Sequence, residues 1–543
     1  MFRIAPAHCY TGAMADAPKP VVLAVLDGFG VSLQARGNAI AAAATPTLDG
    51  FDQRYPFTLL QASGLAVGLP WGEAGNSEVG HLTMGAGRAI YHHLPRISMA
   101  IRDGSFFENP ALRRAAEHAK SRNSSLHLVG LVSSGSAHSY LDHLWALFEL
   151  ARRAGVEKVC LHAITDGKDA PPREAAAFLG ALETRLERDF PGALLASLIG
   201  RFYAMDRDGQ WPRVRAAYEL LTSGAGEPFT DAPAHLRAAY TRGLTDEFIA
   251  PAYRASAGGA LGRIRPGDAI IMFNFREDSV REMTAAFIRE PFDVFPRERL
   301  RDVAFVTMTE YERALTGVEV AFAPIGISWP LGRVLAANGK RQLRVAETEK
   351  YAHVTYFFNG GEEEPFPDED RILVPSLTVE HFDERPEMRA PDIAAKILER
   401  VGEYDFILVN FANADLVGHS GNFQAVVRAV EILDRVLGEI AAAVLQAGGT
   451  LIVTADHGNA EQKIHPVSGE PVTEHTANPV PFYLIGDRFR RPRERTPGEI
   501  TDAKKSVSGI LSDIAPTILE LMQLPQPPEM TGKSLLPILL GRQ

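Results

Sequence analysis

Six carboxylate and imidazole side chains lie close to the ends of apolar, strand-like runs of the sequence. Three such runs, beginning at Val21, Phe406 and Thr450, are each followed by one or two of them, and the sixth precedes the run "NPVPFYLIG". The six residues are Asp27, Asp415, His419, Asp456, His457 and His475. Side chains at the carboxyl ends of parallel strands converge at one edge of a sheet. Carboxylates and imidazoles without a thiolate suit Zn or Mn, which predicts a metal centre.

Each of these residues also has a structural explanation. An aspartate after a strand is often a helix N-cap, and a single histidine is usually a satisfied polar residue. The joint pattern favours a metal centre, and "TADHGNAE" around Asp456 and His457 is its most specific piece. Asp415 and His419 are four residues apart, which places both on one face of a helical turn.

Residues 72–81, "GEAGNSEVGH", place the hydroxyl of Ser77 among turn-forming residues. A simple turn is the alternative explanation, because Gly, Asn and Ser favour turns. Beside a metal centre, however, a serine hydroxyl loses its proton more readily and can attack a phosphoryl group. We therefore interpret Ser77 as a nucleophile, and we expect Gly72, Gly75 and Gly80 to let the backbone approach the phosphoryl group.

A second set of charged residues lies at the ends of other predicted strands. The set is His138, Lys168, Asp169, Arg201, Arg207 and Arg276. Several cations around one carboxylic acid indicate a small dianionic substrate, with Asp169 placed for proton transfer. The alternative is a set of solvated surface ion pairs, which contribute little. Lys350, in "AETEKYAHVTYFFNGG", follows another strand candidate and is expected to meet the phosphoryl group.

Short β-branched runs alternate with amphipathic helical stretches along the chain, which predicts an α/β fold with a mostly parallel sheet flanked by helices. The strand candidates begin at Val21, Ser125, Val159, Leu194, Asp268, Phe406 and Thr450. The clearest helix candidates begin at His143, Arg173 and Phe423.

Turn-rich segments near Tyr91 and Phe322 suggest where the domains divide. The expected organisation is an N-terminal tail of residues 1–18, a discontinuous metal-binding domain of residues 19–91 and 324–543, and an inserted substrate-binding domain of residues 92–323. Two connections between the domains would act as a hinge.

Composition excludes several classes of function. A net charge of −11 opposes binding to nucleic acid or to an anionic membrane surface. The two cysteines, Cys9 and Cys160, are too few for a disulfide framework and suit a reducing compartment. The apolar runs are shorter than the roughly 20 residues that a membrane span needs. We expect a cytoplasmic enzyme, a monomer whose partner is a small-molecule substrate.

These motifs resemble those of the cofactor-independent (2,3-bisphosphoglycerate-independent) phosphoglycerate mutases of the alkaline phosphatase superfamily. The similarity runs from "LDGFG" to "HTANPVPFYL" and includes "GNSEVGHLTMGAGR", "NFANADLVGH" and "TADHGNAEQ". It implies an alkaline phosphatase-like domain with an inserted second α/β domain. It also implies two divalent ions, most often Mn²⁺, and an isomerase that interconverts 3-phosphoglycerate and 2-phosphoglycerate through phosphoserine, with no requirement for 2,3-bisphosphoglycerate.

The resemblance also assigns roles to individual residues. One ion would be held by Asp415, His419 and His475, and the other by Asp27, Ser77, Asp456 and His457. Ser77 would accept the phosphoryl group and Lys350 would aid its transfer. Glycerate would be bound by His138, Lys168, Asp169, Arg201, Arg207 and Arg276.

Two positions depart from the family pattern: Lys168 in "DGKD" and Ser279 in "FREDS" each replace an arginine. Lys and Arg bind anions with different geometry, so the substrate could be a related phosphorylated acid. Arg281 is the nearest cation in sequence that could replace the one missing at position 279. A metal-dependent phosphatase or phosphodiesterase is the alternative enzyme, and loss of the metal ligands would have indicated a binding protein.

Overall fold

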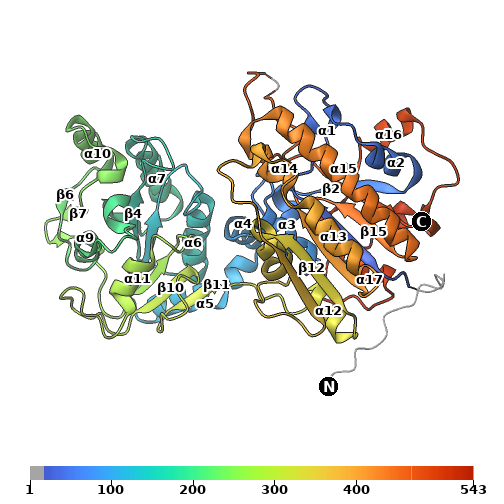
Figure 1. Ribbon diagram of the computed structural model, residues 1–543. Helices are drawn as coiled ribbons and strands as arrows, with labels where there is room; N and C mark the ends of the chain where they lie inside the picture. Colours follow the sequence, from blue (N-terminus) through green and yellow to red (C-terminus); the bar gives the residue numbers. More distant parts are fainter. Residues whose placement is uncertain (1–16, 466, 542–543) are drawn as a thin grey trace. The chain divides into compact units, whose positions relative to one another are not determined.

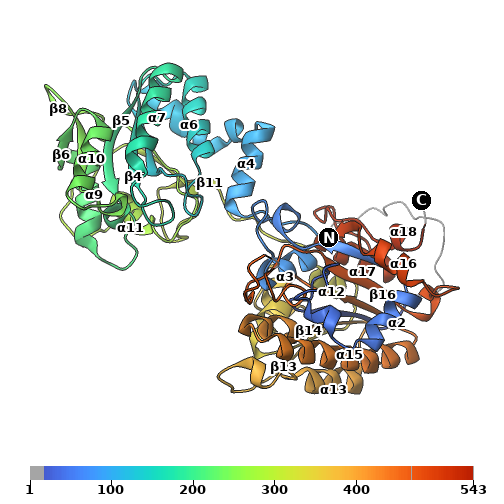
Figure 2. The ribbon, with the colours of Figure 1, turned by 90° about the horizontal axis from the view of Figure 1, so that it is seen from above.

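The computed structural model describes residues 17–465 and 467–541 of the chain, shown in Figures 1 and 2. It comprises two compact units, one that runs up to His92 and resumes at Ile325, and a second that is His93–Pro324. Each unit has one large, mostly parallel sheet with helices, which confirms the predicted α/β class. Of the expected tail, residues 1–18, only Ala17 and Pro18 are among the described residues, and Cys9 lies outside them.

The first unit is built on an eight-stranded sheet. In spatial order its strands are β13 (Glu369–Val374), β12 (Gln342–Glu347), β14 (Phe406–Phe411), β1 (Val21–Leu26), β15 (Thr450–Thr454), β16 (Val480–Ile485), β2 (Phe57–Gln61) and β17 (Val507–Ile510). Only β16 is antiparallel to its neighbours. The central strands β14, β1 and β15 are buried along their whole length, which explains their nearly continuous apolar sequences.

Helices of the first unit pack on both faces of this sheet (Figure 2). They are α1 (Ala39–Ala42), α2 (Pro46–Arg54), α3 (Ser77–Ala86), α12 (Leu331–Ala337), α13 (Ala390–Arg400), α14 (Asn413–Leu416), α15 (Phe423–Gln446), α16 (Pro497–Ala503), α17 (Ile514–Leu521) and α18 (Leu536–Leu539). The longest, α15, begins where the Asn422 side chain accepts a hydrogen bond from the Ala425 N–H. It contacts α13, whereas α3 contacts α12 and α17.

The second unit has a nine-stranded sheet. Its main path is β11 (Glu319–Phe322), β10 (Ala304–Thr309), β9 (Ala269–Met272), β3 (Leu126–Leu131), β4 (Val159–Thr165), β5 (Ala193–Gly200), β7 (Ala252–Ser256) and β6 (Glu227–Phe229), with β8 (Gly259–Ala260) beside β7. Alternate residues of β3 enter two apolar clusters: Leu126 and Leu128 join one, and Val129 and Leu131 join the other. The sheet therefore has an apolar core on each face.

The helices of the second unit supply the other half of these cores. They are α4 (His93–Asp103), α5 (Pro110–Ser121), α6 (Leu141–Ala154), α7 (Ala175–Asp189), α8 (Arg201–Ala204), α9 (Trp211–Ser223), α10 (Ala232–Thr241) and α11 (Arg281–Ile288). Within residues 17–465 and 467–541, no helix combines the length and the apolar character needed to cross a membrane.

Candidate functional site

The strand order of the first unit brings the candidate metal ligands to one edge of its sheet. β14, β1 and β15 are adjacent and parallel, so their carboxyl ends lie side by side. Asp27 follows β1, Asp415 lies in α14 directly after β14, and Asp456 and His457 follow β15. Side chains far apart in sequence, such as those of Asp27 and Asp456, therefore meet, and the edge carries two groups of possible metal ligands.

The first group is Asp415, His419 and His475. Asp415 Oδ1 lies 3.2 Å from Nε2 of each histidine, and the two Nε2 atoms are 3.1 Å apart. Nδ1 of His419 faces the Thr473 carbonyl at 2.6 Å, and Nδ1 of His475 faces the Gly75 carbonyl at 2.8 Å. A carbonyl only accepts, so each Nδ1 carries the proton and leaves the Nε2 lone pair for a cation.

The second group is Asp27, Asp456 and His457, and all three side chains are fully buried. His457 Nε2 lies 3.4 Å from Asp27 Oδ1 and 3.7 Å from Asp456 Oδ2. Asp456 Oδ2 accepts no hydrogen bond from the residues that the structure describes, although His81 Nδ1 is 3.3 Å away. Two buried carboxylates, one of them with an unused oxygen, together with an imidazole nitrogen, suit a divalent cation.

Charges within the second group point to the same conclusion. Burial lowers the pKa of His457, but Asp456 and the other nearby carboxylates outweigh burial and raise that pKa to about 10. In the absence of a cation, His457 therefore carries a proton that compensates the carboxylates. A divalent ion would supply this positive charge in place of the proton.

Ser77 is the first residue of α3 and lies against the second group. The preceding Asn76 is extended, and its side chain accepts a hydrogen bond from the Val79 N–H, which caps the helix at this point. Ser77 Oγ lies 3.0 Å from Asp27 Oδ1 and 3.1 Å from His457 Nε2. A hydroxyl at the positive end of a helix, beside a cation site, is favourably placed to become an alkoxide.

Lys350 connects the two groups. It ends a 3₁₀ turn, Thr348–Lys350, that follows β12, and its Nζ lies 2.7 Å from Asp27 Oδ1, Ser77 Oγ and Asp415 Oδ2. Burial lowers the pKa of this lysine, but Asp27 and Asp415 outweigh burial and raise its pKa above the ordinary value. The ammonium therefore stays charged and has an acceptor for each of its three protons.

The glycines around Ser77 pack closely against the protein itself. A Cβ on Gly75 would lie 2.1 Å from the Ala62 carbonyl oxygen, and one on Gly80 would lie 2.8 Å from Asp456 Cβ. Gly72 has a φ of +79°, which favours glycine, with open space around its Cβ position. These contacts by themselves require glycine at Gly75, in the loop before α3, and at Gly80, within α3. The expected approach of the backbone to a phosphoryl group stays a prediction.

Several buried polar residues of this site were not singled out from the sequence. Asn410, in β14, donates to Asp27 Oδ2 at 2.7 Å and lies 3.1 Å from His81 Nε2. Glu461 accepts from the backbone N–H groups of Gly30 and Asn459, which fixes the loop after β15. Asn410 is the polar residue inside the apolar run "FILVNFA", and this exception to the pattern was the signal that could have identified it.

Residues of the second unit form another polar cluster at the carboxyl ends of its central strands. Arg201, which follows β5, donates to Asp166 Oδ1 and Asp169 Oδ2 at 2.6 Å and to His138 Nε2 at 3.0 Å. Because the guanidinium only donates, the His138 proton is on Nδ1, which donates to Ser279 Oγ at 3.1 Å. Burial, with Arg201 and Arg276, lowers the pKa of His138 to about 4, so this imidazole is neutral at pH 7.

Two further arginines of this cluster share one carboxylate. Arg207 Nη1 lies 2.7 Å from Asp278 Oδ2, and Arg276 Nη2 lies 3.1 Å from the same oxygen. Lys168 is exposed, and its backbone N–H donates to Asp166 Oδ1. Asp166 was not predicted from the sequence, although it directly follows a strand, as Asp27 does.

Arg281 does not supply the missing cation in this structure. It is the first residue of α11, and its Nε donates to the Tyr311 carbonyl at 2.9 Å. Arg281 would project to the same side as position 279 only if this segment were extended, whereas α11 begins at Arg281. Position 279 instead provides the hydroxyl that accepts from His138.

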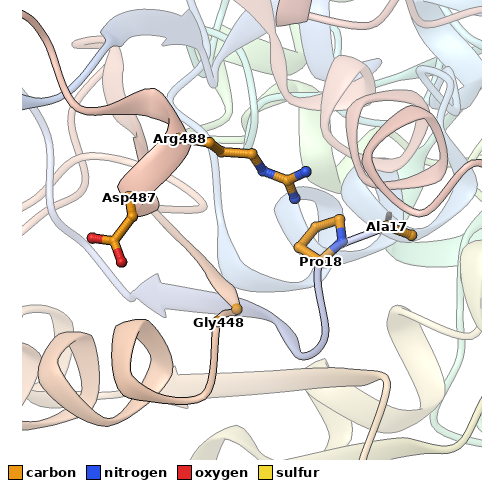
Figure 3. A pocket seen from close by; sticks show the side chains of 6 residues that line it. Ala17, Pro18, Gly448, Asp487 and Arg488 are labelled. Atoms are coloured by element: carbon orange, nitrogen blue, oxygen red, sulfur yellow. The ribbon is translucent and has the colours of Figure 1, made fainter. Parts of the chain in front are cut away.

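A pocket of the first unit lies at the opposite edge of the sheet from the metal ligands. Figure 3 shows it between the residues that precede β1 and β15 and those that follow the antiparallel strand β16. Its lining comprises Ala17, Pro18, Gly448, Gly449, Asp487 and Arg488. The amino ends of the parallel strands meet here, so this pocket is separate from the candidate site.

Comparison with known proteins agrees with this arrangement. The family described as "Metalloenzyme superfamily" matches residues 19–526, which places the chain in that superfamily. The 2,3-bisphosphoglycerate-independent phosphoglycerate mutase of Moorella thermoacetica is 48% identical over 519 residues, covering 95% of this chain and 98% of that protein. The protein of the same name from a Cyanothece species is 49% identical over 522 residues, with 95% of each chain covered. The chain belongs to the 2,3-bisphosphoglycerate-independent phosphoglycerate mutase family.

A solved structure is also similar. The phosphoglycerate mutase of Leishmania mexicana, crystallised at low cobalt concentration, is 30% identical with a TM-score of 0.53. The match covers 95% of this chain and 97% of that one.

Proposed function

We propose that this chain is an isomerase that interconverts 3-phosphoglycerate and 2-phosphoglycerate, with Ser77 as the temporary phosphoryl acceptor. One observation carries the proposal: the Ser77 hydroxyl lies within hydrogen-bond distance of Asp27, His457 and Lys350, at the junction of the two ligand groups. A nucleophile in this position can be deprotonated and can receive a phosphoryl group without any second phosphorylated cofactor.

The two ligand groups would each hold one divalent ion, which we propose to be Mn²⁺. Asp415, His419 and His475 would bind one ion. Asp27, Ser77, Asp456 and His457 would bind the other. The bound ions would ease the loss of the Ser77 proton and neutralise phosphoryl oxygens.

The side chains of the chain itself supply the remaining steps. Ser77 Oγ–H donates to Asp27, so its proton already points toward a carboxylate. As Oγ forms a bond to phosphorus, the bond between phosphorus and the glycerate oxygen breaks, and that oxygen takes up a proton. In the return step the other hydroxyl of glycerate gives up its proton and receives the phosphoryl group, the Oγ–phosphorus bond breaks, and Oγ regains a proton. Lys350, which stays charged, would stabilise the transferred group.

We assign glycerate binding to the polar cluster of the second unit. His138, Lys168, Asp169, Arg201, Arg207 and Arg276 offer cationic and hydrogen-bonding groups to a carboxylate and two hydroxyls. Asp169 would move the proton of the hydroxyl that exchanges the phosphoryl group. In this assignment residues 19–91 and 324–543 form the metal domain, and residues 92–323 form the substrate domain.

The direct test is to incubate the purified protein with Mn²⁺ and 3-phosphoglycerate and to measure 2-phosphoglycerate and inorganic phosphate together. We expect 2-phosphoglycerate to accumulate to equilibrium with little phosphate release. Release of phosphate in place of 2-phosphoglycerate would identify a phosphatase that uses the same serine and metal ligands. If neither 2-phosphoglycerate nor phosphate forms, the substrate is a related phosphorylated acid.

A further inference from the structure

Lys463 is a fully buried cation close to the first ligand group. It follows β15 by nine residues, and 1% of its surface is exposed. Its Nζ donates to the Gly418 carbonyl at 3.1 Å and to Asn459 Oδ1. Burial of a charged lysine is unfavourable unless its donors are used, so these two contacts account for its position.

Asn459 continues the chain of contacts to a candidate ligand. It is fully buried, and its Nδ2 donates to Asp415 Oδ1 at 2.8 Å and to the Asp415 carbonyl at 3.3 Å. Asp415 Oδ1 is the oxygen that faces Nε2 of both His419 and His475. A Cβ on Gly418 would lie 2.6 Å from Asn459 Oδ1, so a glycine at this position is required for the amide to fit.

The donors and acceptors allow only one orientation of the Asn459 amide. Lysine only donates and an ionised carboxylate only accepts, so Oδ1 must face Lys463 and Nδ2 must face Asp415. Without the lysine, Oδ1 would lose its donor in a buried site, and only the Asp415 oxygens would hold the amide in this orientation. Lys463 also holds the carbonyl of Gly418, the first residue of the 3₁₀ turn Gly418–Ser420 that carries His419.

We propose that Lys463 is a positioning residue for the metal ion held by Asp415, His419 and His475. It acts through Asn459, which orients the ligand oxygen of Asp415, and through Gly418, which fixes the turn that carries His419. This inference rests on the proposed assignment of these three residues as ligands.

The direction in which metal affinity changes when Lys463 is removed distinguishes positioning of the ligands from a simple effect of charge. A lysine that acted only through its charge would repel a nearby cation, so its removal would tighten metal binding. A lysine that positions the ligands does the reverse, because removal leaves Asp415 and His419 less well oriented. Loss of such an outer contact typically weakens metal affinity by about 10- to 100-fold.

The experiment measures Mn²⁺ binding to chelator-treated protein by the electron paramagnetic resonance signal of free Mn²⁺. The variants are Lys463→Met, Asn459→Ala, the double variant and Asp415→Ala. Lys504→Met is the matched control, because it removes a partly buried lysine of the same unit that pairs with Asp52. Circular dichroism and thermal unfolding identify the folded variants.

We expect Lys463→Met to weaken one of two Mn²⁺ sites by about 10- to 100-fold, with the second site unchanged. The loss of Mn²⁺ affinity in the double variant should be smaller than the sum of the two single losses, because the two residues share the contact through Asn459, while Lys463 also acts through Gly418. Lys463→Gln, which keeps an N–H donor, should recover part of the loss. Unchanged or tighter binding by folded Lys463→Met would overturn the proposal, and if that variant does not fold, Asn459→Ala tests the same link. If Asp415→Ala binds as many ions as the wild-type protein, the metal assignment itself fails.

Discussion

Lys350 Nζ lies 2.7 Å from Ser77 Oγ and, at the same distance, from carboxylate oxygens of Asp27 and Asp415. The ammonium only donates, so Ser77 accepts from the lysine and directs its own proton to Asp27. One buried cation thus fixes the orientation of the hydroxyl and links the two groups of candidate ligands.

The first prediction concerns the nucleophile. Ser77→Ala removes the acceptor of the phosphoryl group, so mutase activity should fall by at least about 10⁴-fold. The change from hydroxyl to methyl keeps the cap of α3, which Asn76 provides, so folding should be retained.

The assay follows 2-phosphoglycerate formation, with circular dichroism and elemental analysis for fold and metal content. Ser512→Ala, at a buried serine in the turn before α17, is the control and should keep full activity. Near wild-type turnover by Ser77→Ala would end the phosphoserine mechanism.

The second prediction concerns the metal ions. Chelator treatment should abolish activity and Mn²⁺ should restore it, because the ions would ease the loss of the Ser77 proton and neutralise phosphoryl oxygens. Metal affinity should fall as pH decreases, since His419, His457 and His475 bind a cation only when Nε2 is unprotonated. Calorimetric titration in buffers of different ionisation enthalpy would report the protons released. Full activity of protein shown by elemental analysis to be free of metal would contradict this assignment.

The third prediction concerns the stability of the second unit toward acid. His143, in α6, is fully buried, and its Nε2 lies 2.9 Å from Ser98 Oγ. Burial lowers its pKa from the ordinary 6.5 to about 3. Below about pH 6.5 the unfolded chain therefore binds a proton that the folded protein excludes. The neutral His143 ring makes its full contribution to the free energy of unfolding above that pH. This contribution decreases toward pH 3, by about 1.4 kcal/mol per pH unit.

The measurement is the free energy of unfolding in urea at pH 6.5 and at pH 5. The His143→Gln variant should lose about 2 kcal/mol less than the wild-type protein over this range, because it has no ring to protonate. His381→Gln, at an exposed histidine, is the control and should keep the wild-type dependence. Equal dependence in His143→Gln and the wild-type protein would show that His143 is protonated as readily in the folded state.

The strand-end ligands could be predicted from the sequence because one local rule places them. An aspartate or histidine after a buried run lies at the carboxyl edge of a parallel sheet, whatever the order of the strands. Asp27, Asp415 and Asp456 follow that rule. The pairing of these residues into two groups depends on the order β14, β1, β15, which the local pattern does not contain.

Other parts of the site depend on contacts that have no local signature. Gly80 packs against Asp456 from a distant part of the chain, and Lys463 reaches Asp415 only through the amide of Asn459. From the sequence alone, a lysine in a polar stretch that becomes buried in the fold cannot be distinguished from a solvated lysine. The direction of Arg281 was likewise undetermined, because it depends on where α11 begins.

The last prediction tests the identity of the substrate through Arg276 and Arg281. Arg276 shares Asp278 with Arg207 in the polar cluster, whereas the Arg281 guanidinium donates to the Tyr311 carbonyl. If Arg276 binds phosphoglycerate, Arg276→Ala leaves a charged partner unpaired and should cost about 2 to 5 kcal/mol in kcat/KM. Arg281→Ala should cost less than about 1 kcal/mol, since it removes a contact within the protein.

The measurement is kcat/KM on 3-phosphoglycerate for both variants, beside Arg313→Ala as the control. The Arg313 side chain is 90% exposed, so its removal should leave kcat/KM unchanged. A loss at Arg281 as large as that at Arg276 would revive the idea that Arg281 compensates for Ser279. No loss at either position would instead point to a different phosphorylated acid as the substrate, because phosphoglycerate, which carries a carboxylate and a phosphate, should lose affinity when an arginine contact is removed.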